Sequence, residues 1–213
     1  MHSCNKLKGF ALIEVAIAVC IMGVIASITV PTLQSVIAYS KATQTRQALA
    51  RVIHTLAVFV KSYDRLPWAT CDSSGLECDK QIVGGVPFKT LCIEEQITND
   101  GDKNALIYIV NPGLTHVVAQ TSLIPAKPSI FMQFSVQNNM RVILEDGTDA
   151  IDYTEESADF CALTLISISQ KSKCTVDEIV QIDGECIIVR IPNKNSGVTV
   201  RWISRNNIGQ FFD

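Results

Sequence analysis

The chain has 213 residues, of which 18 are Lys or Arg and 21 are Asp or Glu, so its net charge is −3. This acidic balance argues against direct nucleic-acid binding, and an apolar share of 47% excludes disorder as the main state. Charged residues make up 18% of the sequence, below the usual quarter, which indicates that one segment carries almost no charge.

That segment lies near the N-terminus. Residues 10–30 are mostly apolar and carry one charge, Glu14, and no charged residue occurs from Val15 to Ser40. About 20 apolar residues in a helix cross a bilayer, so the sequence predicts a membrane span. Lys6 and Lys8 precede the span, and positive charge on that side predicts a cytoplasmic N-terminus and an external C-terminal domain.

Three interpretations of the span compete. A cleaved secretory signal peptide conflicts with Glu14 inside its apolar core, and with the apolar run that continues beyond a cut near Val24-Ile25-Ala26. A plain uncleaved anchor leaves an intramembrane carboxylate, which costs roughly 2.5–3.5 kcal/mol on insertion scales, without a partner. The third interpretation gives Glu14 a function.

The residues around Glu14 closely resemble the processing site of type IV prepilins and type II secretion pseudopilins. The matching phrase is Lys6-Leu7-Lys8-Gly9-Phe10-Ala11-Leu12-Ile13-Glu14-Val15, in which a short basic leader ends in glycine. The resemblance implies that residues 1–9 are a leader peptide cleaved after Gly9, that Phe10 is N-methylated, and that Glu14 is the fifth mature residue. Pro31 then stands at the twenty-second mature position, where many members of the family carry a helix-bending proline.

The resemblance also implies a mechanism, partners and a location. In that family the glutamate neutralises the new N-terminal amine of a neighbouring subunit, and the apolar helices pack in the core of a filament. Glu14 would then be an assembly residue, because a buried carboxylate is costly unless it is paired. The implied partners are the prepilin peptidase and methylase, other pilin or pseudopilin subunits, and the bacterial inner membrane, with the C-terminal domain in the periplasm before assembly.

The predicted helix continues beyond the span. After Pro31, apolar residues recur at three- and four-residue steps, which is the pattern of an amphipathic helix that packs on a sheet. They are Leu49, Val52, Ile53, Leu56, Phe59, Val60 and Tyr63. No glycine or proline interrupts Thr32 to Tyr63, so one helix is expected over residues 10–63, about 80 Å long at 1.5 Å per residue.

A loop region with cysteines is expected over residues 64–104, and a β-rich domain over residues 105–213. Short apolar or alternating runs separated by turns predict the strands. They cover residues 105–110, 115–119, 129–136, 141–144, 161–168, 179–182, 186–191 and 198–203. We expect 129–136 to pair with 141–144, and Asp183-Gly184 predicts a hairpin.

The predicted fold class is therefore α+β and pilin-like. A long N-terminal helix, membrane-spanning in its first half, would pack on an antiparallel meander of about five to seven strands. The family resemblance at motif level covers residues 1 to about 63. The length of the mature chain and its cysteine-containing loop favour a minor subunit.

The number and positions of the cysteines indicate the cellular compartment of the C-terminal region. Of eight, Cys4 lies in the leader and Cys20 in the span. An even number outside the membrane suggests disulfides in a periplasm-like space; the candidates are Cys71, Cys78, Cys92, Cys161, Cys174 and Cys186. We expect one bridge in the loop region, one among the C-terminal strands and one between these groups. Zinc is not favoured, because six residues separate the closest pair.

Enzyme motifs are not found in the sequence. It lacks a Gly-x-Ser-x-Gly elbow, a phosphate loop, a dinucleotide fingerprint and a His-Glu-x-x-His phrase, so we expect no enzymatic activity and no cofactor. An acidic run contains weak calcium candidates, Asp146, Asp149 and Asp152, although it does not meet the EF-hand spacing. A solvated acidic loop is the plainer interpretation, and we expect no metal.

The sequence leaves pilus, secretion pseudopilus and DNA-uptake pseudopilus open, since all share the N-terminal motif. The alternative function is an uncleaved, membrane-tethered periplasmic domain that binds a ligand and never assembles. That alternative predicts no cleavage and full tolerance of Glu14→Ala. A periplasmic enzyme with a signal anchor would need an organised polar cleft, for which the sequence offers no candidate residues.

Overall fold

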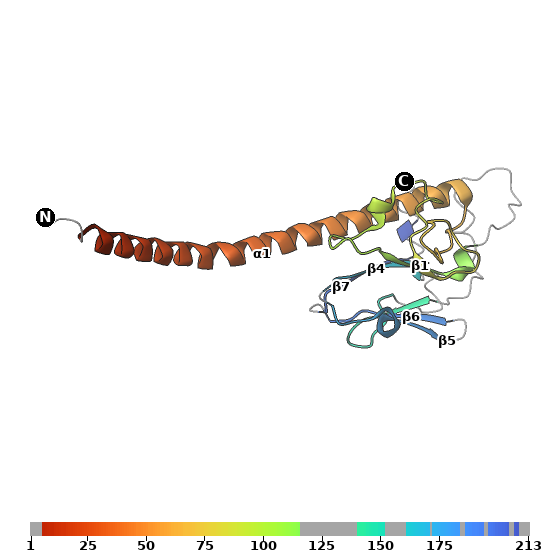
Figure 1. Ribbon diagram of the computed structural model, residues 1–213. Coiled ribbons are helices and arrows are strands. Elements are labelled where there is room, and N and C mark those ends of the chain that lie inside the picture. The colour runs from red at the N-terminus through yellow and green to blue at the C-terminus, as the bar shows by residue number, and fades with distance from the viewer. Residues whose placement is uncertain are drawn as a thin grey trace, which may run out of the picture. The chain divides into compact units, whose positions relative to one another are not determined.

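The computed structural model describes residues 6–115, 140–151, 161–170, 172–183, 186–193, 196–204 and 207–208 (Figure 1). The chain divides into two compact units, Met1–Thr43 and Gln44–Asp213. The described part of the first unit is entirely helical. The second unit contains the end of the same helix and every described strand.

Helix α1 comprises Lys6–Tyr63 and passes through Pro31 without interruption. It confirms the helix predicted over residues 10–63 and begins slightly earlier. Asp64 ends it with a φ of 54°, the left-handed conformation that often follows a last helical turn. The amide of Asp64 still donates to the carbonyl oxygen of Val60 (2.8 Å), so the final turn remains closed.

The described strands form two sheets. The four-stranded sheet has the order β1 (Val83–Gly85), β2 (Ile107–Val110), β4 (Cys161–Ile168) and β7 (Val198–Ser204), with antiparallel neighbours throughout. The three-stranded sheet has the order β3 (Met140–Ile143), β6 (Cys186–Arg190) and β5 (Val180–Asp183). In it β5 and β6 are antiparallel, whereas β3 and β6 are parallel.

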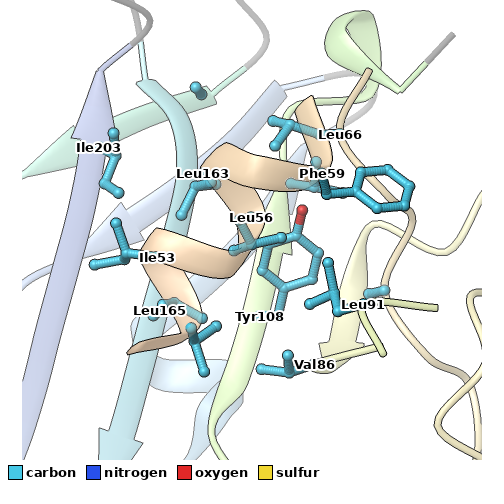
Figure 2. Packing of buried hydrophobic residues seen from close by; sticks show 14 of the residues in the cluster. Ile53, Leu56, Phe59, Leu66, Val86, Leu91, Tyr108, Leu163, Leu165 and Ile203 are labelled. Atoms are coloured by element: carbon cyan, nitrogen blue, oxygen red, sulfur yellow. The ribbon is translucent and has the colours of Figure 1, made fainter. Parts of the chain in front are cut away.

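The second half of α1 packs on one face of the four-stranded sheet (Figure 2). Leu56 of the helix is 1% exposed and shares a core with Tyr108 of β2 and Leu163 of β4. The helical stripe predicted from the sequence is buried as expected, except that Tyr63 is 59% exposed and stacks on the ring of Phe59. The α+β arrangement of a long helix on an antiparallel sheet is therefore confirmed.

A second core lies between the two sheets. Successive strand residues point to opposite faces, so Ile109 and Ile166 face away from α1 and pack with Met140 and Ile187 of the smaller sheet. Strand β4 is consequently covered on both faces, and seven of its eight residues are buried. This explains why β4 reads as a continuous apolar run rather than an alternating one.

The strand order differs from the predicted single meander. The outer face of the four-stranded sheet is apolar, and a second sheet covers it, with β3 joined to β6 in parallel. The hairpin prediction is confirmed by the pairing of Asp183 with Cys186, although Ile179 ends the short helix α2 (Val176–Ile179) instead of starting a strand. The expected run at 129–136 lies outside the described residues.

The region predicted as loop over 64–104 contributes strand β1 and a 3₁₀ turn, η1 (Glu95–Thr98). A second 3₁₀ turn, η2 (Pro112–Leu114), follows β2. The amide of Thr70 donates to the carbonyl oxygen of Gly85 (3.1 Å), which adds a bridge beside β1. Gly84 permits this approach, because a Cβ there would lie 2.0 Å from the carbonyl oxygen of Thr70.

A buried carboxylate ties the same region to β4. One oxygen of Asp100 accepts from the amides of Asp102 and Asn104 (both 2.8 Å), and the other accepts from the hydroxyl of Ser167 (2.7 Å). The adjacent amide of Gly101 donates to the hydroxyl of Thr45 on α1 (3.0 Å). This turn, to which the sequence assigned no role, therefore connects the helix to the sheet.

We expect Leu56→Ala to lower the free energy of unfolding of the second unit by about 2–5 kcal/mol, because it leaves a cavity between α1 and the sheet. Urea unfolding of the full chain in detergent, followed by tryptophan fluorescence, measures the change. Val58→Ala is the matched control, since Val58 is 51% exposed on the same helix. It should change the free energy by no more than about 0.5 kcal/mol. Equal effects would contradict this placement of the core.

Candidate functional site

The first unit has an apolar surface that the chain itself does not cover. In residues 12–42 every side chain is exposed. Leu12, Ile17, Ile21, Ile28 and Leu33 are each more than half exposed. At 3.6 residues per turn these side chains, with their apolar neighbours, point to all sides of α1 rather than to one stripe.

A helix that is apolar on all sides is typical of a membrane span or of the core of a large assembly. From Leu12 onward α1 is long and apolar enough to cross a membrane, and no other helix in the described ranges meets that criterion. The predicted anchor is thus supported by length, composition and exposure together.

Hydroxyl groups inside the apolar segment bond to the helix itself. Thr29 donates to the carbonyl oxygen of Ile25 (2.9 Å), and Thr32 donates to that of Thr29 (2.7 Å). Such bonds satisfy hydroxyl groups without water, as a membrane environment requires. They flank Pro31, which has no amide hydrogen to donate to the preceding turn. These hydroxyl groups are therefore compatible with a bilayer.

Glu14 is exposed within this surface, and it is the one acidic residue of α1. Gly9 and Phe10, the predicted processing residues, lie on the same helix. Phe10 and Glu14 are separated by about one turn, or roughly 6 Å along the axis. The residues predicted for processing and assembly thus lie near one end of the apolar segment of α1, with Pro31 farther along it.

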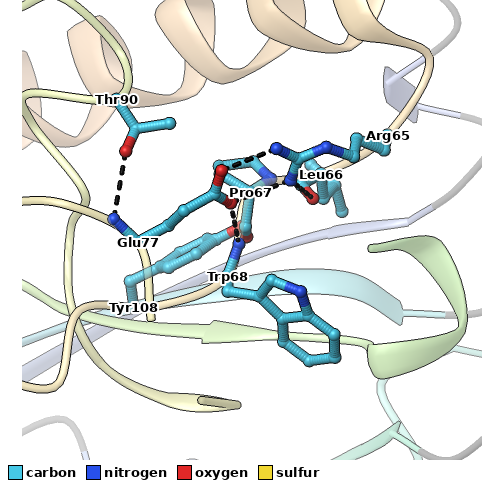
Figure 3. Close-up of polar contacts among 7 residues, drawn as sticks. All are labelled: Arg65, Leu66, Pro67, Trp68, Glu77, Thr90 and Tyr108. Atoms are coloured by element: carbon cyan, nitrogen blue, oxygen red, sulfur yellow. Dashed lines mark hydrogen bonds and ion pairs between the residues drawn. The ribbon is translucent and has the colours of Figure 1, made fainter. Parts of the chain in front are cut away.

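A charge pair fixes the chain where it leaves α1 (Figure 3). The guanidinium of Arg65 donates to both carboxylate oxygens of Glu77 (2.6 and 2.8 Å). Glu77 also accepts from the amide of Trp68 (3.0 Å), and the hydroxyl of Tyr108 donates to the carbonyl oxygen of Pro67 (3.0 Å). These bonds hold residues 65–68 against β2.

The protonation of this cluster follows from its contacts. The hydrogen bond from Arg65 lowers the pKa of Glu77, partial burial opposes that shift, and the Trp68 amide adds to it. The same pair raises the pKa of Arg65. Burial raises the pKa of Tyr108 well above its ordinary value. The cluster therefore consists of an ionised pair and a neutral phenol at neutral pH, which suits a structural role.

One of the three expected disulfides is present. Cys71 and Cys78 are bonded, as expected for the loop region. The prediction of two further bridges is wrong, because Cys92, Cys174 and Cys186 are free cysteines.

The thiol of Cys161 is buried and donates to the carbonyl oxygen of Leu163 (3.5 Å). It lies in the core between the sheets, whereas Cys92 is exposed. Both thiols are free, so the expected link between the two cysteine groups is not formed.

The acidic run after β3 forms a turn and an ion pair. One oxygen of Asp146 accepts from the amide (2.9 Å) and the hydroxyl (2.6 Å) of Thr148, which lowers the pKa of Asp146. Arg141 donates to both oxygens of Asp149 (2.7 and 3.2 Å). Asp152 lies outside the described residues. Within the described residues no three His, Cys, Asp or Glu side chains are grouped as metal ligands, so the calcium candidates gain no support.

No protein-family model matches this chain, and no curated protein or solved structure matches it either. Its function is therefore inferred from its own residues. The strongest of these are the motif around Gly9 and Glu14 and the exposed apolar surface of α1.

The sequence did not reveal the polar clusters of the second unit. Arg65 stands two residues after α1 and Glu77 immediately before Cys78, but nothing in that spacing shows that the disulfide loop folds back onto the helix end. Asp100-Gly101-Asp102 carries a weak signal, because Asp before Gly is typical of a turn. The hydrogen bond between Asp100 and Ser167 of β4 depends on the tertiary fold.

Glu77→Gln should lower the free energy of unfolding at pH 7 by about 1–3 kcal/mol, because a hydrogen-bonded charge pair is lost. The pKa of Glu77 is lower in the folded state than its unfolded value of about 4.3. The stabilisation is thus present above that pH and is lost as the pH falls through the lower folded-state pKa.

Urea unfolding between pH 7 and pH 3 should therefore show the parent chain and Glu77→Gln converging at low pH. Asp79→Asn, which removes a nearby exposed carboxylate, is the control. If the unfolding free energy of Asp79→Asn converges with that of the parent chain as strongly as that of Glu77→Gln does, the effect is not specific to the Arg65–Glu77 pair.

Alkylation under denaturing, non-reducing conditions should add five groups to a chain that begins at Phe10. The thiols involved are Cys20, Cys92, Cys161, Cys174 and Cys186. Intact mass measures the number of groups added, and reduction should raise it by the two cysteines of the single disulfide. One added group before reduction would instead indicate three bridges.

Proposed function

We propose that this chain is a prepilin-like structural subunit. It is cleaved after Gly9, N-methylated at Phe10 and held in the bacterial inner membrane by the first half of α1, with its second unit in the periplasm. It then assembles through α1 into a type IV pilus or a type II secretion pseudopilus, as a minor subunit. The observation that carries the proposal is an exposed, all-round apolar helix with one carboxylate, Glu14, near its start.

The exposed surface requires a nonpolar environment. Fully burying one Val, Leu or Ile side chain contributes about 1.5–3 kcal/mol, and fifteen large apolar side chains between Leu12 and Tyr39 are more than half exposed. On the same scale, moving these fifteen side chains out of water is favoured by roughly tens of kcal/mol in total. A bilayer supplies that environment before assembly, and neighbouring α1 helices supply it afterwards.

Glu14 distinguishes assembly from simple anchoring. A bilayer covers the apolar side chains but offers a carboxylate no counter-ion, at a cost of roughly 2.5–3.5 kcal/mol. Cleavage after Gly9 creates a cationic amine about one helical turn from the level of Glu14. A neighbouring chain displaced by that distance along the axis brings its amine to Glu14, so one residue pair neutralises both charges and fixes the stagger.

Glu14→Ala should leave cleavage intact and reduce incorporation into filaments by about tenfold or more, because the amine of the neighbour loses its counter-ion. The variant is expressed at full length in its host. Mass spectrometry measures its processing, and immunoblotting of sheared filaments measures its assembly. Gln34→Ala, an exposed polar residue of the same segment, is the control and should assemble normally. Normal incorporation of Glu14→Ala would contradict the role of Glu14 in assembly, whereas a parent chain that is neither cleaved nor incorporated would favour the tethered binding domain.

A further inference from the structure

A half-open cavity of about 200 Å³ lies in the second unit, between α1 and the turn that precedes β2. Six polar residues line it: Gln44, Gln47, Arg51, Gln96, Asn99 and Asp100. Four of these carry amide groups, which can both donate and accept, and Arg51 supplies a cation. A planar guanidinium among amides is a suitable environment for a carboxylate.

Arg51 has no acidic partner among the described residues. Its guanidinium is exposed, and the two ion pairs in the described ranges join other residues. Asp100 is the one carboxylate in the wall, but it is 7% exposed and its two oxygens already accept from the amides of Asp102 and Asn104 and from Ser167. Within the part of the chain that the structure describes, Arg51 is therefore a cation without an ion-pair partner at the edge of the cavity, and the Asp100 carboxylate is buried and engaged with other groups.

The charges that remain after the proposed cleavage are divided between two parts of the chain. Residues 10–63 carry four Lys or Arg and one Asp or Glu, a net charge of +3, whereas residues 64–213 carry twelve and twenty, a net charge of −8. Arg46 and Arg51 are both exposed on α1. This part of the helix thus presents a basic surface, and the rest of the second unit supplies the complementary acidic charge.

We propose that this cavity binds an acidic side chain from residues 64–213 of a neighbouring copy of this chain, with Arg51 as its counter-ion. The inference rests on the proposed function, because the apolar segments of α1 must first bring copies side by side. The basic surface of one copy would meet the acidic surface of the next, so the contact is heterologous. Contacts of that kind repeat into an open filament unless the rotation closes a ring.

The test measures association of chains that begin at Phe10, as the proposed cleavage would leave them, in vesicles of zwitterionic lipid, by energy transfer between donor and acceptor dyes on C-terminal tags. Arg51→Gln should weaken association by about threefold to tenfold at low salt and reduce its salt dependence. Lys61→Gln is the matched control: it removes the same charge from an exposed position of the same helix, outside the cavity. It should change association by less than about twofold.

Gln47→Ala tests the cavity without a change of charge and should also weaken association. Equal effects of Arg51→Gln and Lys61→Gln would overturn the proposal, because they would indicate general electrostatics. An effect of Arg51→Gln confined to vesicles with anionic lipid would overturn it too, since Arg51 would then contact headgroups. Strong association that Arg51→Gln leaves unchanged would overturn the cavity proposal alone. Parent chains that never associate would overturn the filament proposal as well.

Discussion

Fifteen large apolar side chains of α1 between Leu12 and Tyr39 are more than half exposed, and this surface determines how the protein can exist. In water it would drive nonspecific association, so the chain needs a membrane or neighbouring helices. Glu14 lies within the same surface and needs a cation wherever the surface is buried. In the proposed assembly, the apolar residues provide the driving force for association and the carboxylate provides the register.

The second unit makes a different use of the same helix. Beyond Gln44, buried residues such as Leu56 recur at helical spacing and pack on the four-stranded sheet, whose other face is covered by the three-stranded sheet. The Arg65–Glu77 pair then fixes the chain as it leaves the helix. One helix therefore combines an exposed apolar segment with the helical part of a folded unit, and Arg46, Arg51 and Lys61 of that unit are exposed.

Local patterns predicted the elements whose contacts are close in sequence. The length of α1 follows from an apolar run and a 3.6-residue stripe, the β5–β6 pair from Asp183-Gly184, and the disulfide loop from Cys71 and Cys78. The parallel pairing of β3 with β6 could not be predicted, because it depends on burying one face of another sheet. Asp100 likewise bonds to Ser167 only after β4 is in place, so its role has no sequence signal of its own.

The central claim is that the chain is processed as a prepilin, and the most direct test is the intact mass and N-terminal sequence of the protein recovered from its native membrane. The account predicts a mature chain that begins with N-methylated Phe10, because the basic leader ends at Gly9. A chain that begins at Met1, or near Ser27 after signal-peptide cleavage, would contradict it. The exposed helix would then be an anchor or a removed signal, and Glu14 would need another explanation.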